Sequence, residues 1–250
     1  AFVREMYPKL LKYHKWWYAK RDHDKNHICE FGSVDGTLVA AAWESGMDNA
    51  IRFDGTKMLQ NGPDAWSTDQ ESVDLNAYLS LEYTLLKKFA ALLDEPFLLP
   101  DYRSMVAAYF FDKKDGFFYD RRMNATRDFV REAGCEGYIP FWANIATKEQ
   151  FAKARKLLDN KKKFSTYIPF PTIAADNPKY DPKGYWRGPI WLDQTYYGIK
   201  GYRNYGEGKK ADAYTDQVFR NIEGLTEGAP IYENYDTHTG KPMQASHFSW

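Results

Sequence analysis

Residues 73–94 read Val-Asp-Leu-Asn-Ala-Tyr-Leu-Ser-Leu-Glu-Tyr-Thr-Leu-Leu-Lys-Lys-Phe-Ala-Ala-Leu-Leu-Asp, and this stretch decides the fold class. Its apolar residues recur every three or four positions, which is typical of an α-helix with one buried face. Pro96 follows closely and predicts that the helix ends before it. We therefore expect a long core helix here.

Further helices are predicted on both sides of this stretch. They cover residues 8–21, a segment after Pro100-Asp101, residues 147–158, 190–205 and 209–222. The third begins with the capping box Thr147-Lys148-Glu149-Gln150. Residues 31–60 are rich in Gly, Ser and Asp and predict a long irregular loop, and strand periodicity is weak throughout. Helices joined alternately by short and long loops favour an all-α fold, a toroidal α/α array with functional loops on one face.

The composition narrows the class of function. The 250-residue chain has a formal net charge of zero, so nothing favours nucleic acid or an anionic membrane as a partner. It contains no run of eighteen apolar residues. Aromatic residues make up 17%, with eight Trp and nineteen Tyr, and such rings suit the C–H faces of sugars, although a core of large side chains accounts for many of them. Cys29 and Cys135 could pair or stay as thiols.

The segment Trp43-Glu44-Ser45-Gly46-Met47-Asp48-Asn49 carries two acids beside a Trp and a Gly. Residues 184–193 and 228–236 repeat this combination of carboxylate, aromatic ring and Gly or Pro. Cleavage of a glycosidic bond needs one protonated carboxyl to assist the leaving oxygen and one ionised carboxyl as base or nucleophile. The pattern therefore indicates a sugar-cleaving site, and the alternative is a set of solvated acidic turns.

Four ordered motifs give the chain a specific resemblance. They are Trp43–Asp48, Val73–Ala77, Tyr185–Trp191 and Glu233–Tyr235. Together they resemble glycoside hydrolase family 63, most closely its bacterial YgjK-type α-glucosidases, and more loosely the trehalases. The resemblance covers roughly residues 20–250 and implies an (α/α)6 barrel that hydrolyses α-glucosidic bonds with inversion.

The resemblance also implies roles for particular residues. Asp48 is the expected general acid and Glu233 the expected general base that activates water, with their carboxyls roughly 6.5–9.5 Å apart. Composition alone does not choose Asp48 over Glu44, which is expected to support it, or Glu233 over Asp236. The expected substrate-binding residues are Trp43, Gly46, Gln70, Trp186, Arg187 and Trp191. Gln70 is the weaker candidate, and packing of a helix end is the alternative for the two Trp of the third motif.

The loop that begins at Asp22 has the spacing of an EF-hand-like calcium site. Oxygen-bearing side chains stand at positions one, three and five, and a main-chain carbonyl at position seven. His27 replaces the usual Gly at position six, and Ser33 replaces the usual Glu at position twelve. YgjK-type enzymes hold a structural calcium in a similar loop closed by a distant Glu. The expected ligands are Asp22, Asp24, Asn26, Ile28 and Glu95; a hydrogen-bonded polar turn is the alternative. No organic cofactor is expected.

The chain begins at Ala1 and ends at Trp250 within its patterns, so we expect residues 1–250 to be part of one catalytic domain whose flanking regions are absent. No signal peptide is present, and the resemblance implies a periplasmic or secreted enzyme. The expected partners are an α-linked glucose di- or oligosaccharide and water. A non-hydrolytic carbohydrate-binding or scaffold module is the alternative. A sugar epimerase would need catalytic histidines in the loops, where His238 and His247 lie outside every matched motif.

Overall fold

The computed structural model describes residues 1–248, and the chain forms two compact units. Unit 1 comprises Ala1–Asp48, Gly55–Phe110 and Asp120–Val130. Unit 2 comprises Asn49–Asp54, Phe111–Tyr119 and Arg131–Trp250. Asp48, the expected acid, belongs to unit 1, and Glu233, the expected base, belongs to unit 2.

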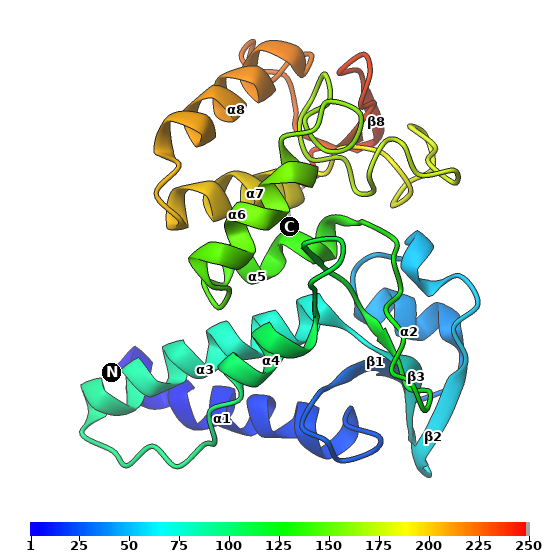
Figure 1. The fold of residues 1–250 in the computed structure, drawn as a ribbon. Coiled ribbons are helices and arrows are strands. Elements are labelled where there is room, and N and C mark those ends of the chain that lie inside the picture. Colours follow the sequence, from blue (N-terminus) through cyan, green and yellow to red (C-terminus); the bar gives the residue numbers. More distant parts are fainter. Residues whose placement is uncertain (249–250) are drawn as a thin grey trace. The chain divides into compact units, whose positions relative to one another are not determined.

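Unit 1 combines four helices with a small antiparallel sheet (Figure 1). Its elements are α1 (Phe2–Lys20), β1 (Glu30–Ser33), α2 (Leu38–Glu44), β2 (Met58–Gly62), β3 (Ala65–Glu71), α3 (Val73–Leu93), α4 (Arg103–Tyr109) and β6 (Arg121–Arg122). The predicted helix over 73–94 is confirmed as α3. Asp94 ends it in the left-handed conformation, with φ of 57°.

Helices α1 and α3 lie side by side and share an apolar cluster built on Tyr7, Leu86 and Ala90 (Figure 1). The prediction that the first helix starts at Pro8 is wrong, because α1 begins at Phe2 and contains Pro8 in its interior. Proline disfavours a helix interior. Burial of Tyr7 against α3 favours the earlier start, since that residue packs only if the first turns are helical.

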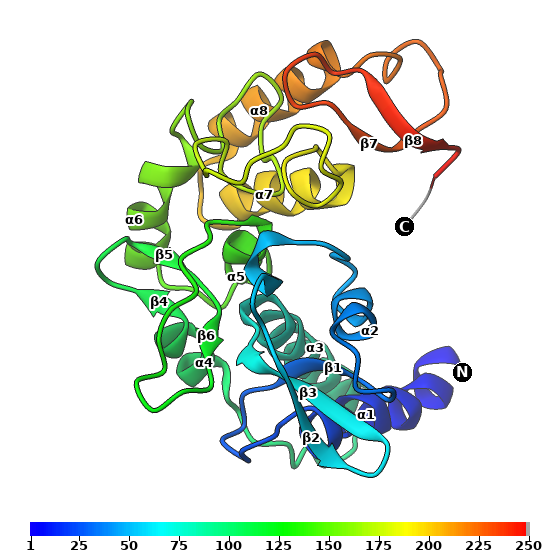
Figure 2. The same cartoon turned by 90° about the vertical axis from the view of Figure 1, so that its right-hand side faces the viewer.

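The prediction of an irregular loop over residues 31–60 is also wrong. This segment contains α2 and supplies most of β1 and of β2 to a sheet of order β1-β3-β2, in which β6 also pairs with β3 (Figure 2). Strand β3 is buried along most of its length, and Asp120 next to β6 accepts a bond from the N–H of Val73 at 2.7 Å. The sheet therefore fixes the start of α3 and the loops that follow α1 and α2.

Unit 2 contains the helices of the second half and two short hairpins. Its elements are the 3-10 helices η1 (Ile51–Phe53) and η2 (Cys135–Tyr138), the helices α5 (Ile139–Trp142), α6 (Lys148–Leu158), α7 (Leu192–Asn204) and α8 (Gly208–Asn221), and the strands β4 (Phe111–Asp112), β5 (Phe117–Phe118), β7 (Tyr232–Tyr235) and β8 (Pro242–Ser246). The capping box at Thr147 is confirmed at the start of α6.

The core of unit 2 holds β7 against α7 and α8. Tyr235 packs with Ile190, Val218 and Ile222, and its backbone exchanges two hydrogen bonds of 2.9 Å with Ile190. This pairing fixes β7, which carries Glu233, to the residues just before α7. Within residues 1–248, the buried Cys29 and Cys135 form no disulfide, and no helix has both the length and the apolar character needed to cross a membrane.

Candidate functional site

The segment that carries the proposed acid follows the short helix α2. Trp43 is 63% exposed near the end of that helix, and Gly46 turns the chain with φ of 75°. No atom lies within 4 Å of the place that a side chain at Gly46 would occupy. Asp48 is partly buried in the turn just after the buried Met47. The segment therefore presents an open aromatic face and a carboxyl on a turn anchored by an apolar side chain.

Glu44, which the sequence predicts to support Asp48, is bonded to other residues of unit 1. Its carboxylate accepts a two-pronged bond from Arg21, at 2.7 and 2.9 Å, and a bond from the N–H of Gly32 at 2.6 Å. These contacts join the end of α1, strand β1 and helix α2.

Gln70 lies apart from any open surface. Its side chain is fully buried in β3, where its amide accepts a bond from Thr56 at 3.1 Å and donates one to Asp120 at 2.8 Å. This placement favours a structural role for Gln70 over direct contact with a sugar.

The turn before α7 brings three large aromatic rings together in unit 2. Trp186 and Trp191 stack with their rings 3.9 Å apart and 16° from parallel, and both are buried. The edge of Tyr185 meets Trp191 at 5.1 Å. The Trp191 indole also donates to the carbonyl of Tyr185 at 3.0 Å. The stack is thus a rigid aromatic wall, and much of its surface is used within the protein.

Glu233 lies on β7 next to this turn and is partly buried. The Tyr185 hydroxyl donates to Glu233 Oε1 at 2.5 Å, and the N–H of Ala245 approaches Oε2 at 3.4 Å. The carboxylate is therefore oriented from both sides. A fixed carboxylate beside an aromatic wall is suited to act as a base on a bound water.

Arg187 anchors the same turn to the segment 49–54. Its guanidinium binds Asp54 through two bonds of 3.0 and 3.1 Å, and Lys179 binds the same carboxylate at 2.9 Å. These cations hold the pKa of Asp54 below its usual range, mainly through the Arg187 bond. Because its guanidinium is bonded to Asp54, Arg187 helps to fix the conformation of the turn.

Several buried polar atoms near the start of α7 and on β7 have no hydrogen-bond partner among the described residues. They are Asp193 Oδ1, Gln194 Oε1, Thr195 Oγ1 and both side-chain polar atoms of Asn234. Buried polar atoms in folded proteins are nearly always bonded, so such a group of exceptions is typical of a place that holds water or ligand.

Asp193→Asn is expected to change how stability depends on pH. Burial raises the pKa of the Asp193 carboxyl above 3.8, so this group makes the wild-type fold less stable as the pH rises from about 4 through the raised value. The asparagine amide does not ionise, so the variant does not lose this stability as the pH rises. Urea unfolding at pH 4 and pH 7 should show a smaller decrease for this variant than for wild type or for Asp216→Asn on exposed α8 surface. An equal decrease in all three would contradict it.

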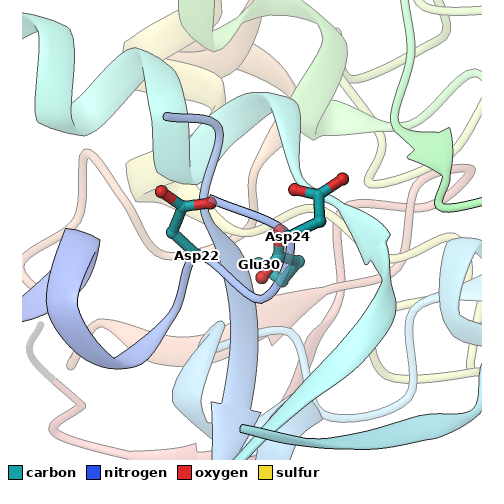
Figure 3. A group of neighbouring side chains, drawn as sticks. All are labelled: Asp22, Asp24 and Glu30. Atoms are coloured by element: carbon teal, nitrogen blue, oxygen red, sulfur yellow. The ribbon is translucent and has the colours of Figure 1, made fainter. Parts of the chain in front are cut away.

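The acidic loop between α1 and β1 brings together a carboxylate set that differs from the expected one. Oxygens of Asp22, Asp24 and Glu30 all lie within 4.8 Å of one another (Figure 3). Glu30 is fully buried, its Oε1 has no partner among the described residues, and burial raises its pKa well above the usual range. A buried carboxylate oxygen without a partner, next to two more carboxylates, fits a hard divalent cation such as Ca²⁺.

The assignment of Glu95 to this site is wrong. Glu95 is exposed beyond the end of α3 and lies near Tyr7, a residue in the second turn of α1 whose pKa is raised first by burial and then by the charge of Glu95. Asp22 follows the other end of α1, roughly 20 Å away at the helical rise per residue. Asn26 turns its amide oxygen to the N–H of Ile28 at 2.8 Å and its amide nitrogen to Glu71 at 2.6 Å.

Positive charge already offsets part of this acidic cluster. The Arg127 guanidinium contacts Asp24 and binds Glu71 at 3.0 Å. Glu71 is fully buried and is also bonded by the Tyr109 hydroxyl. Arg127 therefore ties the acidic loop to strand β3 and lowers the charge that a bound cation has to compensate.

A family model described as the mannosylglycerate hydrolase MGH1-like glycoside hydrolase domain matches residues 1–250. The chain belongs to this family. The resemblance to glycoside hydrolase family 63 that the four motifs predicted is thereby confirmed, and the matching branch is the MGH1-like one.

Individual relatives agree with this membership. The chain is 25% identical to mannosylglycerate hydrolase MGH1 of Selaginella moellendorffii, covering all of this chain and 59% of that protein. It is 24% identical to mannosylglycerate hydrolase of Thermus thermophilus, covering 99% of this chain and 68% of that protein. The chain therefore spans about 60–70% of the length of these relatives.

Solved structures resemble the fold. The structure of a GH63 mannosylglycerate hydrolase from Thermus thermophilus in complex with glucose matches with a TM-score of 0.78 at 21% identity, over 99% of this chain and 66% of that one. The neutral trehalase Nth1 of Saccharomyces cerevisiae matches less closely, with a TM-score of 0.62 over 80% of this chain and 38% of that one. The fold is thus similar to that of family 63 and trehalase proteins, and the expected all-α class holds only in part, because strands β1–β8 pair into small sheets beside the helices.

Four residues that the sequence did not single out shape these sites. Tyr185 contacts Glu233, Asn49 and Asp54 hold the turn that carries Tyr185, and Glu30 completes the acidic cluster. A usable signal existed only for Glu30, which stands at position nine of the spacing that begins at Asp22.

Proposed function

We propose that this chain provides the catalytic residues of an inverting glycoside hydrolase that cleaves an α-glycosidic bond, with Glu233 as general base and Asp48 as general acid. The observation that carries the proposal is the Glu233 carboxylate, which is held by Tyr185 beside the Trp186–Trp191 stack, in a chain of a glycoside hydrolase family. We further propose that the helices form part of an (α/α)6 toroid.

The proposed reaction needs one water and two carboxyls. Glu233 takes a proton from the water as its oxygen forms a bond to the anomeric carbon. The glycosidic C–O bond breaks with its electron pair on the leaving oxygen, which receives a proton from Asp48. Each carboxyl thus ends in the opposite protonation state and is reset by solvent. The exposed Trp43 is proposed to line the sugar site, with Gly46 leaving room for the substrate, and the buried Trp186–Trp191 stack is proposed to support the residues around Glu233 from behind.

The substrate is proposed to be an α-linked glucose di- or oligosaccharide. The names of the relatives add mannosylglycerate as a second candidate. Both candidates are tested by incubating the protein with a panel of α-linked glucose disaccharides and mannosylglycerate, while proton NMR monitors the hydrolysis of each compound. A β-anomer as the first-formed sugar supports inversion, and an α-anomer rules it out. Sugar binding in calorimetry without any product would instead favour a non-hydrolytic binding module.

We also propose that Asp22, Asp24 and Glu30 hold a structural Ca²⁺, with the carbonyl of Ile28 as a further ligand. The ion would neutralise the buried Glu30 and fix the loop between α1 and β1. It takes no part in the proposed reaction. A periplasmic or secreted location remains a proposal that rests on the resemblance alone.

Calcium is expected to raise the thermal midpoint of the wild-type protein by about 5–10 °C at roughly 100 times its Kd, and EDTA to reverse the rise. Glu30→Gln should abolish the shift, because it removes a charge from the ligand set. Glu95→Gln is the matched control and should keep the shift in full. Differential scanning fluorimetry measures all three. A wild-type midpoint that does not respond to calcium would contradict the site.

A further inference from the structure

Tyr185 has a backbone conformation that an aromatic residue rarely adopts. It lies in a turn closed by a bond from the N–H of Arg187 to the carbonyl of Gly184, at 3.2 Å, and its φ is 65°. The left-handed region is unfavourable for a residue with a side chain, because its Cβ comes too close to the following carbonyl oxygen. Such a conformation persists only where the surrounding structure holds it, and it is often found at functional sites.

Asn49 is the side chain that holds this conformation from both sides. Its amide nitrogen donates to the carbonyl of Gly184 at 3.0 Å, and its amide oxygen accepts from the N–H of Trp186 at 2.9 Å. The two bonds therefore bracket Tyr185. A side-chain amide offers a donor and an acceptor side by side, so it can pair with two backbone groups as another backbone would.

The segment that carries Asn49 is itself fixed to the turn at two further points. Arg187 donates to the carbonyl of Asn49 at 3.2 Å and forms its two-pronged ion pair with Asp54 at the other end of the segment. Residues 49–54 and 184–187 are thus held together by several hydrogen bonds, although they lie more than 130 residues apart in the sequence.

The same turn aims a hydroxyl at the proposed base. The Tyr185 hydroxyl donates to Glu233 Oε1, and this bond limits the rotation of the carboxylate. Within residues 1–248 the other oxygen, Oε2, has the long contact of 3.4 Å with the N–H of Ala245, and it is the oxygen better placed to accept a proton from water. If the turn relaxed, the hydroxyl would move with it and the carboxylate would lose its orientation.

We propose that Asn49 is a positioning residue, which holds Tyr185 in its left-handed conformation and through Tyr185 sets the orientation of the Glu233 carboxylate. This role rests on the proposed function of Glu233 as the base. It explains why an exposed asparagine makes two hydrogen bonds to so distant a turn. Loss of these bonds should lower the rate of the chemical step and leave the affinity for substrate nearly unchanged, because misplacement of a reacting group by about 1 Å can cost 100-fold in rate.

The test is a double-mutant cycle between Asn49→Ser and Tyr185→Phe, measured as kcat and KM on the best substrate of the panel. Asn49→Ser alone should lower kcat about 10–100-fold, with KM within about threefold of wild type. In the Tyr185→Phe background the same change should cost less than about threefold, since the hydroxyl that Asn49 positions is already gone. Losses that multiply in the double variant would overturn the role, as would an Asn49→Ser kcat within twofold of wild type.

Two controls separate this role from general loss of structure. Asn204→Ser removes another side-chain amide that makes two bonds to distant backbone groups, here the carbonyls of Phe141 and Trp142, and should leave kcat unchanged. Asn49→Asp keeps the acceptor for the N–H of Trp186 but turns a charged oxygen to the carbonyl of Gly184, so it should lower kcat at least as much as Asn49→Ser. A kcat for Asn49→Asp within twofold of wild type would overturn the role.

Asn49 directly follows Asp48 in the chain, so an effect on the proposed acid has to be distinguished from an effect on the proposed base. Substrates with different leaving groups make this distinction. The fluoride ion of a glycosyl fluoride leaves with little need of a proton. A defect at the base should therefore lower kcat by the same factor on a glycosyl fluoride as on an alkyl glycoside. An equal loss on both substrates supports the role, and a loss that disappears with the fluoride overturns it.

The outcome for the wild-type protein separates this role from the proposed function. A wild-type protein that hydrolyses no glycoside overturns the proposed function, and this role with it. An active wild type with unaffected Asn49 variants overturns this role alone.

Discussion

Glu233→Ala is expected to lower kcat on an α-glycoside by about 10²–10⁴-fold, the usual contribution of a general base. Water is a poor nucleophile at the anomeric carbon unless a base takes its proton as the bond forms. Glu233 is partly buried on a strand that is held by the pairing of Tyr235 with Ile190. Because that pairing does not involve the Glu233 side chain, the variant should keep its fold.

The control for this prediction is Glu227→Ala, an exposed glutamate of the same unit. Both variants should unfold within a few degrees of wild type, and only Glu233→Ala should lose turnover. The measurement is the steady-state rate at saturating substrate, followed by release of the free sugar. If Glu233→Ala retained a tenth or more of the wild-type kcat, another group would have to serve as base.

The helices were predictable because their signals are local. The apolar periodicity of residues 73–94 and the capping box at Thr147 each act within one or two turns, and α3 and α6 begin where these signals place them. The start of α1 was missed because Pro8 marks a helix start in isolation. Its neighbour Tyr7 packs on α3, some eighty residues further along the chain.

Strand β1 was not predictable, because the hydrogen bonds that define it are long-range. Strand β1 is short and contains Glu30, Gly32 and Ser33, so it lacks the apolar alternation typical of strands. It is a strand because β3, more than thirty residues later, pairs with it. Burial of polar residues in β3 depends on partners such as Asp120, and no local pattern reveals these partners.

The candidate site divides in the same way. The resemblance nominated Asp48 and Glu233, while residue chemistry alone left other acids open. Tyr185 and Asn49 were missed because their roles follow from contacts over 48 and 137 residues. For the acidic loop, spacing identified Asp22 and Asp24, and the error at Glu95 came from placing a distant ligand by sequence position. The carboxylate that completes the cluster, Glu30, lies in the loop's own spacing.

Asp48→Asn is expected to lower kcat on an alkyl α-glycoside by about 10²–10⁴-fold, because the leaving alkoxide then departs without a proton. Asparagine has nearly the shape of aspartate, and Asp48 lies in a turn that the buried Met47 anchors, so the fold should be kept. Asp64→Asn, at an exposed position in the turn between β2 and β3, is the matched control.

The choice of leaving group tests the role of Asp48 directly. With a glycosyl fluoride the leaving ion is a weak base and needs little protonation, so the Asp48→Asn variant should recover most of its rate on that substrate. Glu233→Ala should not recover on the fluoride, since its defect concerns the attacking water. The pair of variants therefore assigns acid and base independently of any distance between them. An equal loss for Asp48→Asn on both substrates would mean that Asp48 does not donate the proton, and Glu44 would not replace it, because its carboxylate is already bonded by Arg21 and Gly32.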